Sequence, residues 1–132
     1  MAIDWKEAEN LDRYFTKFTR EHLSSKPGRI SAEGLINMLD NNEKVLILDI
    51  RTDYEADLAG YTIKNSIRIP MDRLFRRKNL EKLMEYQDHK IVLSCHSGVR
   101  TLVASAFLQR IGFTNTFSLE GGLAAFALAV HP

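Results

Sequence analysis

The feature that most constrains the fold of this chain is a run of branched apolar residues at positions 45–50, interrupted only by Asp49. Such unbroken runs are typical of strands buried on both faces of a parallel sheet, whereas strands with one solvent-exposed face alternate apolar and polar residues. A second apolar run begins at Ile91 and ends at Cys95. Stretches with helical periodicity separate these runs, which predicts βαβ units and an α/β fold with a central, mostly parallel sheet.

The same criteria locate the remaining elements of the predicted fold. We expect five strands, at residues 29–30, 45–50, 66–69, 91–95 and 116–119. Helices are expected on both faces of the sheet, at residues 32–39, 52–58, 71–87 and 100–111 and through residues 125–128. Ser31 is the expected N-cap of the first of them, and Gly112 the stop after residue 111.

The first 28 residues are predicted to form an N-terminal helical extension with its linker, ahead of a domain at 29–132. Apolar residues spaced three or four apart mark one face of an amphipathic helix over about residues 3–23; they are Trp5, Ala8, Leu11, Phe15 and Phe18. We expect this face to cover one side of the sheet. The alternative is an interface with a partner, such as a homodimer formed through this helix. The linker is expected at residues 24–28, SSKPG.

Composition excludes several classes of protein. A formal net charge of +1 over 132 residues argues against a dedicated binder of nucleic acid or of membrane surfaces. The N-terminus lacks the pattern of a signal peptide, and no apolar run is long enough to cross a bilayer. A single cysteine excludes an internal disulfide, and these features together predict a cytoplasmic protein. The four histidines are scattered and no phosphate-binding glycine motif occurs, so we expect neither metal nor cofactor.

The most reactive site predicted by the sequence is Cys95, at the end of a buried strand. A short polar loop with Gly98 follows it, and a helix begins near Arg100. The first N–H groups of a helix lack carbonyl partners and favour negative charge. A thiol surrounded by them has a depressed pKa, of roughly 3.5 to 7.5 in other proteins. The alternative is a small buried hydrophobic residue, but the neighbouring hydroxyl, glycine and cation favour a nucleophile.

Residues 95–100, CHSGVR, resemble the active-site loop of single-domain rhodaneses, the thiosulfate sulfurtransferase-like family. The resemblance extends to LILDIRTDYE at 46–55, IKNSIRIP at 63–70 and SLEGGLAAF at 118–126, in the family's order. It implies a rhodanese-like fold and a thiosulfate-type sulfurtransferase with Cys95 as nucleophile. The expected substrate-binding residues are those that follow it in the loop, namely His96, Ser97, Gly98, Val99 and Arg100.

Three further features of the sequence bear on the site. Asp49 and Arg51 end a predicted strand and match an Asp-x-Arg of the family, and we expect them to support the active loop structurally. Where the family commonly has Gly-His-Ile, this chain has GYTI at 60–63, with no histidine and the glycine displaced by one. A basic run begins the helix at 71–87. It forms either a solvated face or a set of anion-steering residues; the candidates are Arg73, Arg76 and Arg77.

The sequence is compatible with three functions. The first is sulfur transfer from a small anionic donor to cyanide or to a thiol, carried by a small molecule or a protein, through a persulfide on Cys95. The second is a phosphatase or arsenate reductase, disfavoured because only four residues separate Cys95 from Arg100 where those enzymes have five. The third is a non-catalytic binding module or a sulfur relay dedicated to one protein partner.

Overall fold

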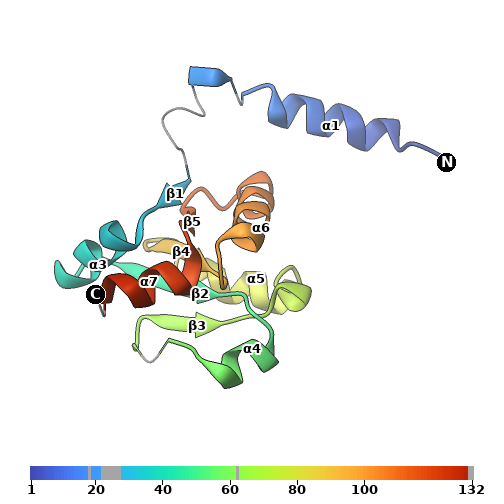
Figure 1. The fold of residues 1–132 in the computed structure, drawn as a ribbon. Helices are drawn as coiled ribbons and strands as arrows, with labels where there is room; N and C mark the ends of the chain where they lie inside the picture. Colours follow the sequence, from blue (N-terminus) through green and yellow to red (C-terminus); the bar gives the residue numbers. More distant parts are fainter. Residues whose placement is uncertain (18, 22–27, 62, 131–132) are drawn as a thin grey trace.

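The sheet has the predicted strands, and all its pairings are parallel. The computed structural model describes residues 1–17, 19–21, 28–61 and 63–130. The strands are β1 (Arg29–Ile30), β2 (Val45–Asp49), β3 (Ser66–Arg68), β4 (Lys90–Ser94) and β5 (Thr116–Leu119). Their spatial order is β1-β5-β4-β2-β3, with β4 at the centre (Figure 1). This is the α/β fold that the apolar runs predicted.

Helices pack on both faces of this sheet. One face is covered by α5 (Arg77–Met84) and α6 (Val99–Arg110), and the other by α3 (Ala32–Asp40) and α7 (Gly122–Val130) (Figure 1). Strand β2 shows why both layers are needed: Leu46 and Leu48 pack with the first face and Val45 and Ile47 with the second. All five residues of β2 are buried, as its continuous apolar run predicted.

Several loops gather at the carboxyl ends of the strands. Strand β2 leads into α4 (Asp53–Leu58), and β3 leads into the short 3₁₀ helix η1 (Met71–Arg73). The helix predicted over 71–87 is therefore two shorter elements, η1 and α5. Strand β4 leads to Cys95, and β5 to a glycine pair at 121–122 that starts α7. In parallel sheets this edge is the usual place for a ligand site.

The N-terminal helix differs from the prediction. Helix α1 (Trp5–Phe15) ends at Phe15, where the hydroxyl of Thr16 bonds to the carbonyl of Asp12; residues 16–17 form a turn, and the backbone is helical again at 20–21. None of its residues is buried, and it stands apart from the sheet (Figure 1). The expectation that α1 covers a sheet face is wrong, because the other helices already fill both faces. The apolar position at Phe18 and the linker at 24–27 lie outside the described residues.

Helix α1 instead contacts the outer side of α6. The hydroxyl of Tyr14 donates to the carbonyl of Ala106 at 2.9 Å, and Arg110 pairs with Glu7 at 2.8 Å. Trp5 and Phe15 stay 72% and 55% exposed. The predicted homodimer through this helix remains a prediction.

Candidate active site

The candidate site is built around Cys95, which follows the last residue of the central strand. Its side chain points to the α5–α6 face, and the residue is only 1% exposed. The chain then turns through Gly98, which has φ 91° and caps the start of α6. This positive φ suits glycine, and it directs the N–H of Gly98 to the sulfur of Cys95 at 3.1 Å.

The loop and the first turn of α6 set the charge state of this thiol. Burial raises the pKa of Cys95, but the backbone N–H groups of Thr101, Gly98, Arg100 and Ser97 together hold it below its usual value. These are the unpaired donors expected at a helix start, and they stabilise the anion more than the neutral thiol. The arrangement suits a thiolate nucleophile in a site largely closed to solvent.

A second turn fixes the loop from the opposite side. Leu123 at the start of α7 donates its N–H to the carbonyl of Cys95 at 2.8 Å, and Ala124 donates to that of His96 at 3.2 Å. Gly122 has φ 57°, and a β-carbon there would overlap the carbonyl oxygen of Cys95. The glycine pair predicted to form a tight turn therefore lets α7 approach the nucleophile's own backbone.

Asp49 and Arg51 form a buried ion pair beside this loop. Arg51 donates from Nε and Nη2 to the two carboxylate oxygens of Asp49, at 2.9 and 2.8 Å, and its backbone N–H bonds to the same carboxylate. Both residues are nearly inaccessible. A further bond, from Nη1 of Arg51, reaches the carbonyl of Glu55 at 3.4 Å and links the pair to α4. The pair thus ties the end of β2 to the helix that follows it.

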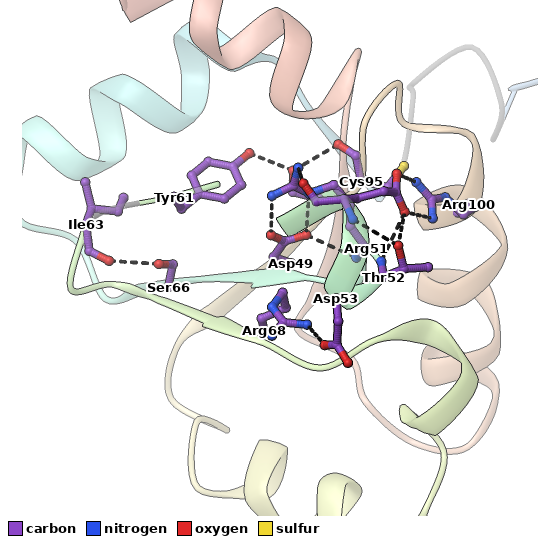
Figure 2. Close-up of polar contacts among 12 residues, drawn as sticks. Asp49, Arg51, Thr52, Asp53, Tyr61, Ile63, Ser66, Arg68, Cys95 and Arg100 are labelled. Atoms are coloured by element: carbon purple, nitrogen blue, oxygen red, sulfur yellow. Dashed lines mark hydrogen bonds and ion pairs between the residues drawn. The ribbon is translucent and has the colours of Figure 1, made fainter. Parts of the chain in front are cut away.

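Arg100 also has a carboxylate partner. Its Nη1 and Nη2 atoms donate to the two oxygens of Glu55 at 2.8 and 2.7 Å, next to Cys95 (Figure 2). These bonds and those from Thr52 lower the pKa of Glu55 to about 2. The pKa of Arg100 is raised, first by Glu55 and further by the nearby thiolate of Cys95. The guanidinium expected to hold a donor is therefore already neutralised by Glu55.

The other loop residues face different directions. His96 lines an apolar cavity of about 430 Å³ between α4 and α7, together with Leu58 and Leu123. Ser97 is exposed and supplies its backbone N–H to the site, and Val99 begins α6 with 66% of its surface exposed. The structure brings the backbones of the predicted binding residues together at Cys95, but not all their side chains.

The three arginines of the basic run also lie in different surroundings. Arg73 lines a cleft of about 680 Å³ at the sheet edge, and Arg100 lies on the wall of the same cleft. Arg73 is also 3.3 Å from Asp53, which pairs in addition with Arg68. Arg76 and Arg77 are exposed and are not among the residues that line this cleft, and Arg77 pairs with Glu81 on its own helix.

Sequence reasoning missed a hydroxyl chain behind the nucleophile. The hydroxyls of Tyr61 and Ser94 lie 2.6 Å apart, and Ser94 reaches the carbonyl of Cys95 at 3.4 Å (Figure 2). Burial raises the pKa of Tyr61 to about 12, so it stays protonated. On the other side Thr101 bonds to Ser118 at 2.7 Å. The only sequence signal was the departure from the family at Tyr61.

The described part of the chain has neither a metal-binding cluster nor a membrane-spanning helix. Within it, no group of three or more His, Cys, Asp or Glu side chains is placed to hold a metal ion. None of the described helices is long and apolar enough to cross a membrane.

Comparison with protein families decides the classification. The family model described as rhodanese-like domain matches residues 31–129. The chain belongs to the rhodanese-like family. A rhodanese-related protein from Thermoplasma volcanium has a similar structure, with a TM-score of 0.64 and 29% identity over 79% of this chain and 94% of that one. The family resemblance inferred from the loop at 95–100 is confirmed.

Other rhodanese-like relatives are parts of longer proteins. A tRNA uridine(34) hydroxylase from Cronobacter sakazakii is 38% identical over 68% of this chain, but the match spans 26% of that protein. A NAD-dependent persulfide reductase from A. fulgidus is 32% identical over 69% of this chain and 15% of its own, with a TM-score of 0.52. This chain therefore matches only about a quarter of the curated relative's length.

Proposed function

We propose that this rhodanese-like protein is a sulfurtransferase that carries a sulfane sulfur as a persulfide on Cys95. The observation that carries the proposal is the geometry of the thiol, whose sulfur accepts the N–H of Gly98 at 3.1 Å at the start of α6. Donors of this kind stabilise a thiolate, and they serve equally for the terminal anion of a persulfide. The donor is a small sulfane-sulfur compound, such as thiosulfate or an organic persulfide.

In the first step the thiolate of Cys95 attacks the outer sulfur of thiosulfate. A new S–S bond forms to Cys95, the S–S bond of thiosulfate breaks, and its electron pair leaves with sulfite. The backbone N–H groups at residues 97, 98, 100 and 101 hold the negative charge in place throughout. No redox cofactor or metal enters this step, because the donor supplies both the sulfur and the leaving group.

In the second step a thiophile collects the sulfur. Cyanide attacks the terminal sulfur of the persulfide and leaves as thiocyanate, which restores the thiolate of Cys95. A thiol acceptor would take the sulfur in the same way and become a persulfide itself. Two half-reactions through one covalent intermediate predict ping-pong kinetics.

Phosphate chemistry fits this site less well. Only four residues separate Cys95 from Arg100, so the loop is one residue shorter than the Cys-x5-Arg loops of phosphatases on this kind of fold. Arg100 also has both terminal nitrogens bonded to Glu55. A tetrahedral phosphate would need that guanidinium to hold its oxygens. Hydrolysis of a phosphate ester by Cys95 would contradict the proposal.

The names of the relatives supply a second candidate function. Relatives at up to 38% identity are named tRNA uridine(34) hydroxylases, although this chain matches 26% of the length of the first of them. Incubation with tRNA and analysis of its nucleosides by mass spectrometry tests this candidate. Uridine gaining one oxygen atom would favour hydroxylation over sulfur transfer.

Mass spectrometry of the intact protein tests the leading proposal. Because the chain has one cysteine, thiosulfate should add the mass of one sulfur atom at a single site, and cyanide should remove it as thiocyanate. Cys95→Ser is the matched control, since it changes one atom and should gain no sulfur. A wild-type protein that gains no sulfur from thiosulfate or from an organic persulfide would overturn the proposal.

A further inference from the structure

The ion pair between Glu55 and Arg100 lies beside Cys95, with Arg100 on the wall of the 680 Å³ cleft and Glu55 on the wall of the 430 Å³ cavity that His96 also lines. Besides its two bonds to Arg100, the carboxylate of Glu55 accepts the N–H of Thr52 at 3.0 Å and its hydroxyl at 3.1 Å. These contacts form a capping box at the start of α4. Glu55 is therefore held by the start of α4 as well as by Arg100.

This pairing removes the side-chain charge that an anionic donor would use. Arg51 is neutralised by Asp49, and Arg100 by Glu55. The guanidinium of Arg100 that faces the thiolate is thus shared with the carboxylate of Glu55, and the backbone N–H dipoles at Cys95 hold the remaining negative charge. A doubly charged anion that approaches the thiolate also approaches the carboxylate of Glu55. The repulsion grows in proportion to the charge of the donor.

We propose that Glu55 is a specificity-determining residue that selects against doubly charged donors such as thiosulfate and in favour of neutral or singly charged ones. This inference rests on the sulfurtransferase function proposed above and names its preferred donor class, organic persulfides. With such a donor, the thiolate of Cys95 attacks the terminal sulfur of RSSH, the S–S bond breaks, and RS⁻ leaves. The proton stays with the transferred sulfur, so the step needs no further reactant.

Substitution of Glu55 by glutamine separates charge from structure. A glutamine side chain still accepts the N–H of Thr52 in the capping box, but it leaves Arg100 with its full charge. Glu81→Gln is the matched control, because Glu81 also pairs with an arginine, Arg77, but on helix α5, and it lines neither the 680 Å³ cleft nor the cavity that Glu55 lines. Equal melting temperatures for the wild type and Glu55→Gln near pH 2 would show that the capping box is intact.

Anion binding measured by NMR provides a test that needs no turnover. The amide signals of residues 97–101 would be followed during titration with sulfate, which is doubly charged, and with methanesulfonate, which is singly charged. In Glu55→Gln we expect sulfate to bind about tenfold and methanesulfonate about threefold more tightly than in the wild type, since the removed repulsion scales with charge. Glu81→Gln should match the wild type. Equal affinities in the wild type and Glu55→Gln would overturn the inference.

Kinetics then connect this binding to sulfur transfer. In Glu55→Gln the KM for thiosulfate should fall several-fold, with a smaller fall for methanethiosulfonate, a singly charged donor, and a smaller change in kcat. A higher KM for thiosulfate would mean that Glu55 positions Arg100 for the donor, which contradicts the inference. If the NMR result holds but no variant forms a persulfide, the sulfurtransferase function fails while the anion selectivity of Glu55 stands.

Discussion

The α-carbon of Gly122 lies so close to the carbonyl oxygen of Cys95 that a β-carbon at residue 122 would overlap it. This contact joins the β5–α7 turn to the backbone of the proposed nucleophile, 27 positions earlier in the sequence. The carbonyl is held in addition by the N–H of Leu123 at 2.8 Å. The position of the sulfur therefore depends on the start of α7 as well as on β4.

Gly122→Ala should displace the Cys95 loop. Alanine at φ 57° costs about 1 to 2 kcal/mol of backbone strain, and the overlap with Cys95 adds to it. We expect a loss of about 2 to 4 kcal/mol in the free energy of unfolding, with sulfur transfer reduced in the molecules that remain folded. Gly112→Ala is the control, because its φ is also positive, 121°, but its β-carbon would meet open space. Full transfer activity in Gly122→Ala would contradict this account of the turn.

Cys95→Ser should abolish sulfur transfer with little effect on stability. The hydroxyl is nearly the size of the thiol and still accepts the N–H of Gly98, but it is not ionised at neutral pH and cannot carry the sulfur. Steady-state thiocyanate formation and thermal unfolding would be measured on the same preparations. Residual transfer above a few percent of wild type would exclude Cys95 as the carrier.

Asp49→Ala should act through the fold. It leaves Arg51 as an unpaired charge in a position that is 2% exposed, which costs about 3 to 5 kcal/mol when a buried pair is broken. Urea unfolding measures this loss. Asp53→Ala removes an ion pair of the same type at an exposed site and should cost much less, because solvent screens the pair. Similar losses in the two variants would remove the scaffolding role given to Asp49.

Much of the fold could be predicted because its signals are local. The run at 45–50 has no solvent-exposed face, so it has to be an interior strand of the sheet. The N-cap at Ser31 and the positive φ of Gly112 follow from single residue types. The length and role of α1 could not be predicted. Its amphipathic spacing is the same whether the apolar face meets a sheet, another helix or a partner.

In the site, too, the contacts between residues close in sequence could be predicted, and those between distant residues could not. The Cys95 loop and its backbone donors lie within the consecutive residues 95–101, and sequence reasoning found all of them except Thr101. The partner of Arg100 lies 45 positions away on α4, and Tyr61 lies 33 positions from Ser94. Nothing in one sequence selects Glu55 rather than the other acidic residues as the partner of Arg100, because that pairing depends on how α4 crosses the strand ends.

The pH dependence of stability provides a test of the Glu55 contact. The pKa of Glu55 is about 2 in the folded protein and its ordinary value is 4.5, so the unfolded chain binds a proton first as pH falls. The contribution of its charge is fully present above pH 4.5 and is lost as pH falls through about 2. The melting temperatures of wild type and Glu55→Gln should differ at pH 7 and converge toward pH 2. A difference that stays constant with pH would mean that the charge of Glu55 contributes nothing.

Arg73 and Arg100 line the same cleft, but they should assist an anionic donor in two different ways. Arg73 is 38% exposed on the cleft wall, with Asp53 at 3.3 Å, and should act as a long-range attractor. Arg73→Gln should therefore lower kcat/KM for thiosulfate about two- to threefold at low salt, and the loss should shrink at high ionic strength, since screening acts over about 8 Å at physiological ionic strength.

Two variants complete this salt experiment. Arg77→Gln is the control, because Arg77 is 93% exposed, pairs with Glu81 and is not among the residues of the cleft wall. Arg100→Ala should reduce transfer at all salt concentrations, because it removes a contact beside Cys95 and also leaves Glu55 without its partner. If Arg73→Gln and Arg77→Gln both match the wild type at low salt, the basic run is only a solvated face. Donor capture then depends on the backbone donors of the Cys95 loop, which no substitution in that run would alter.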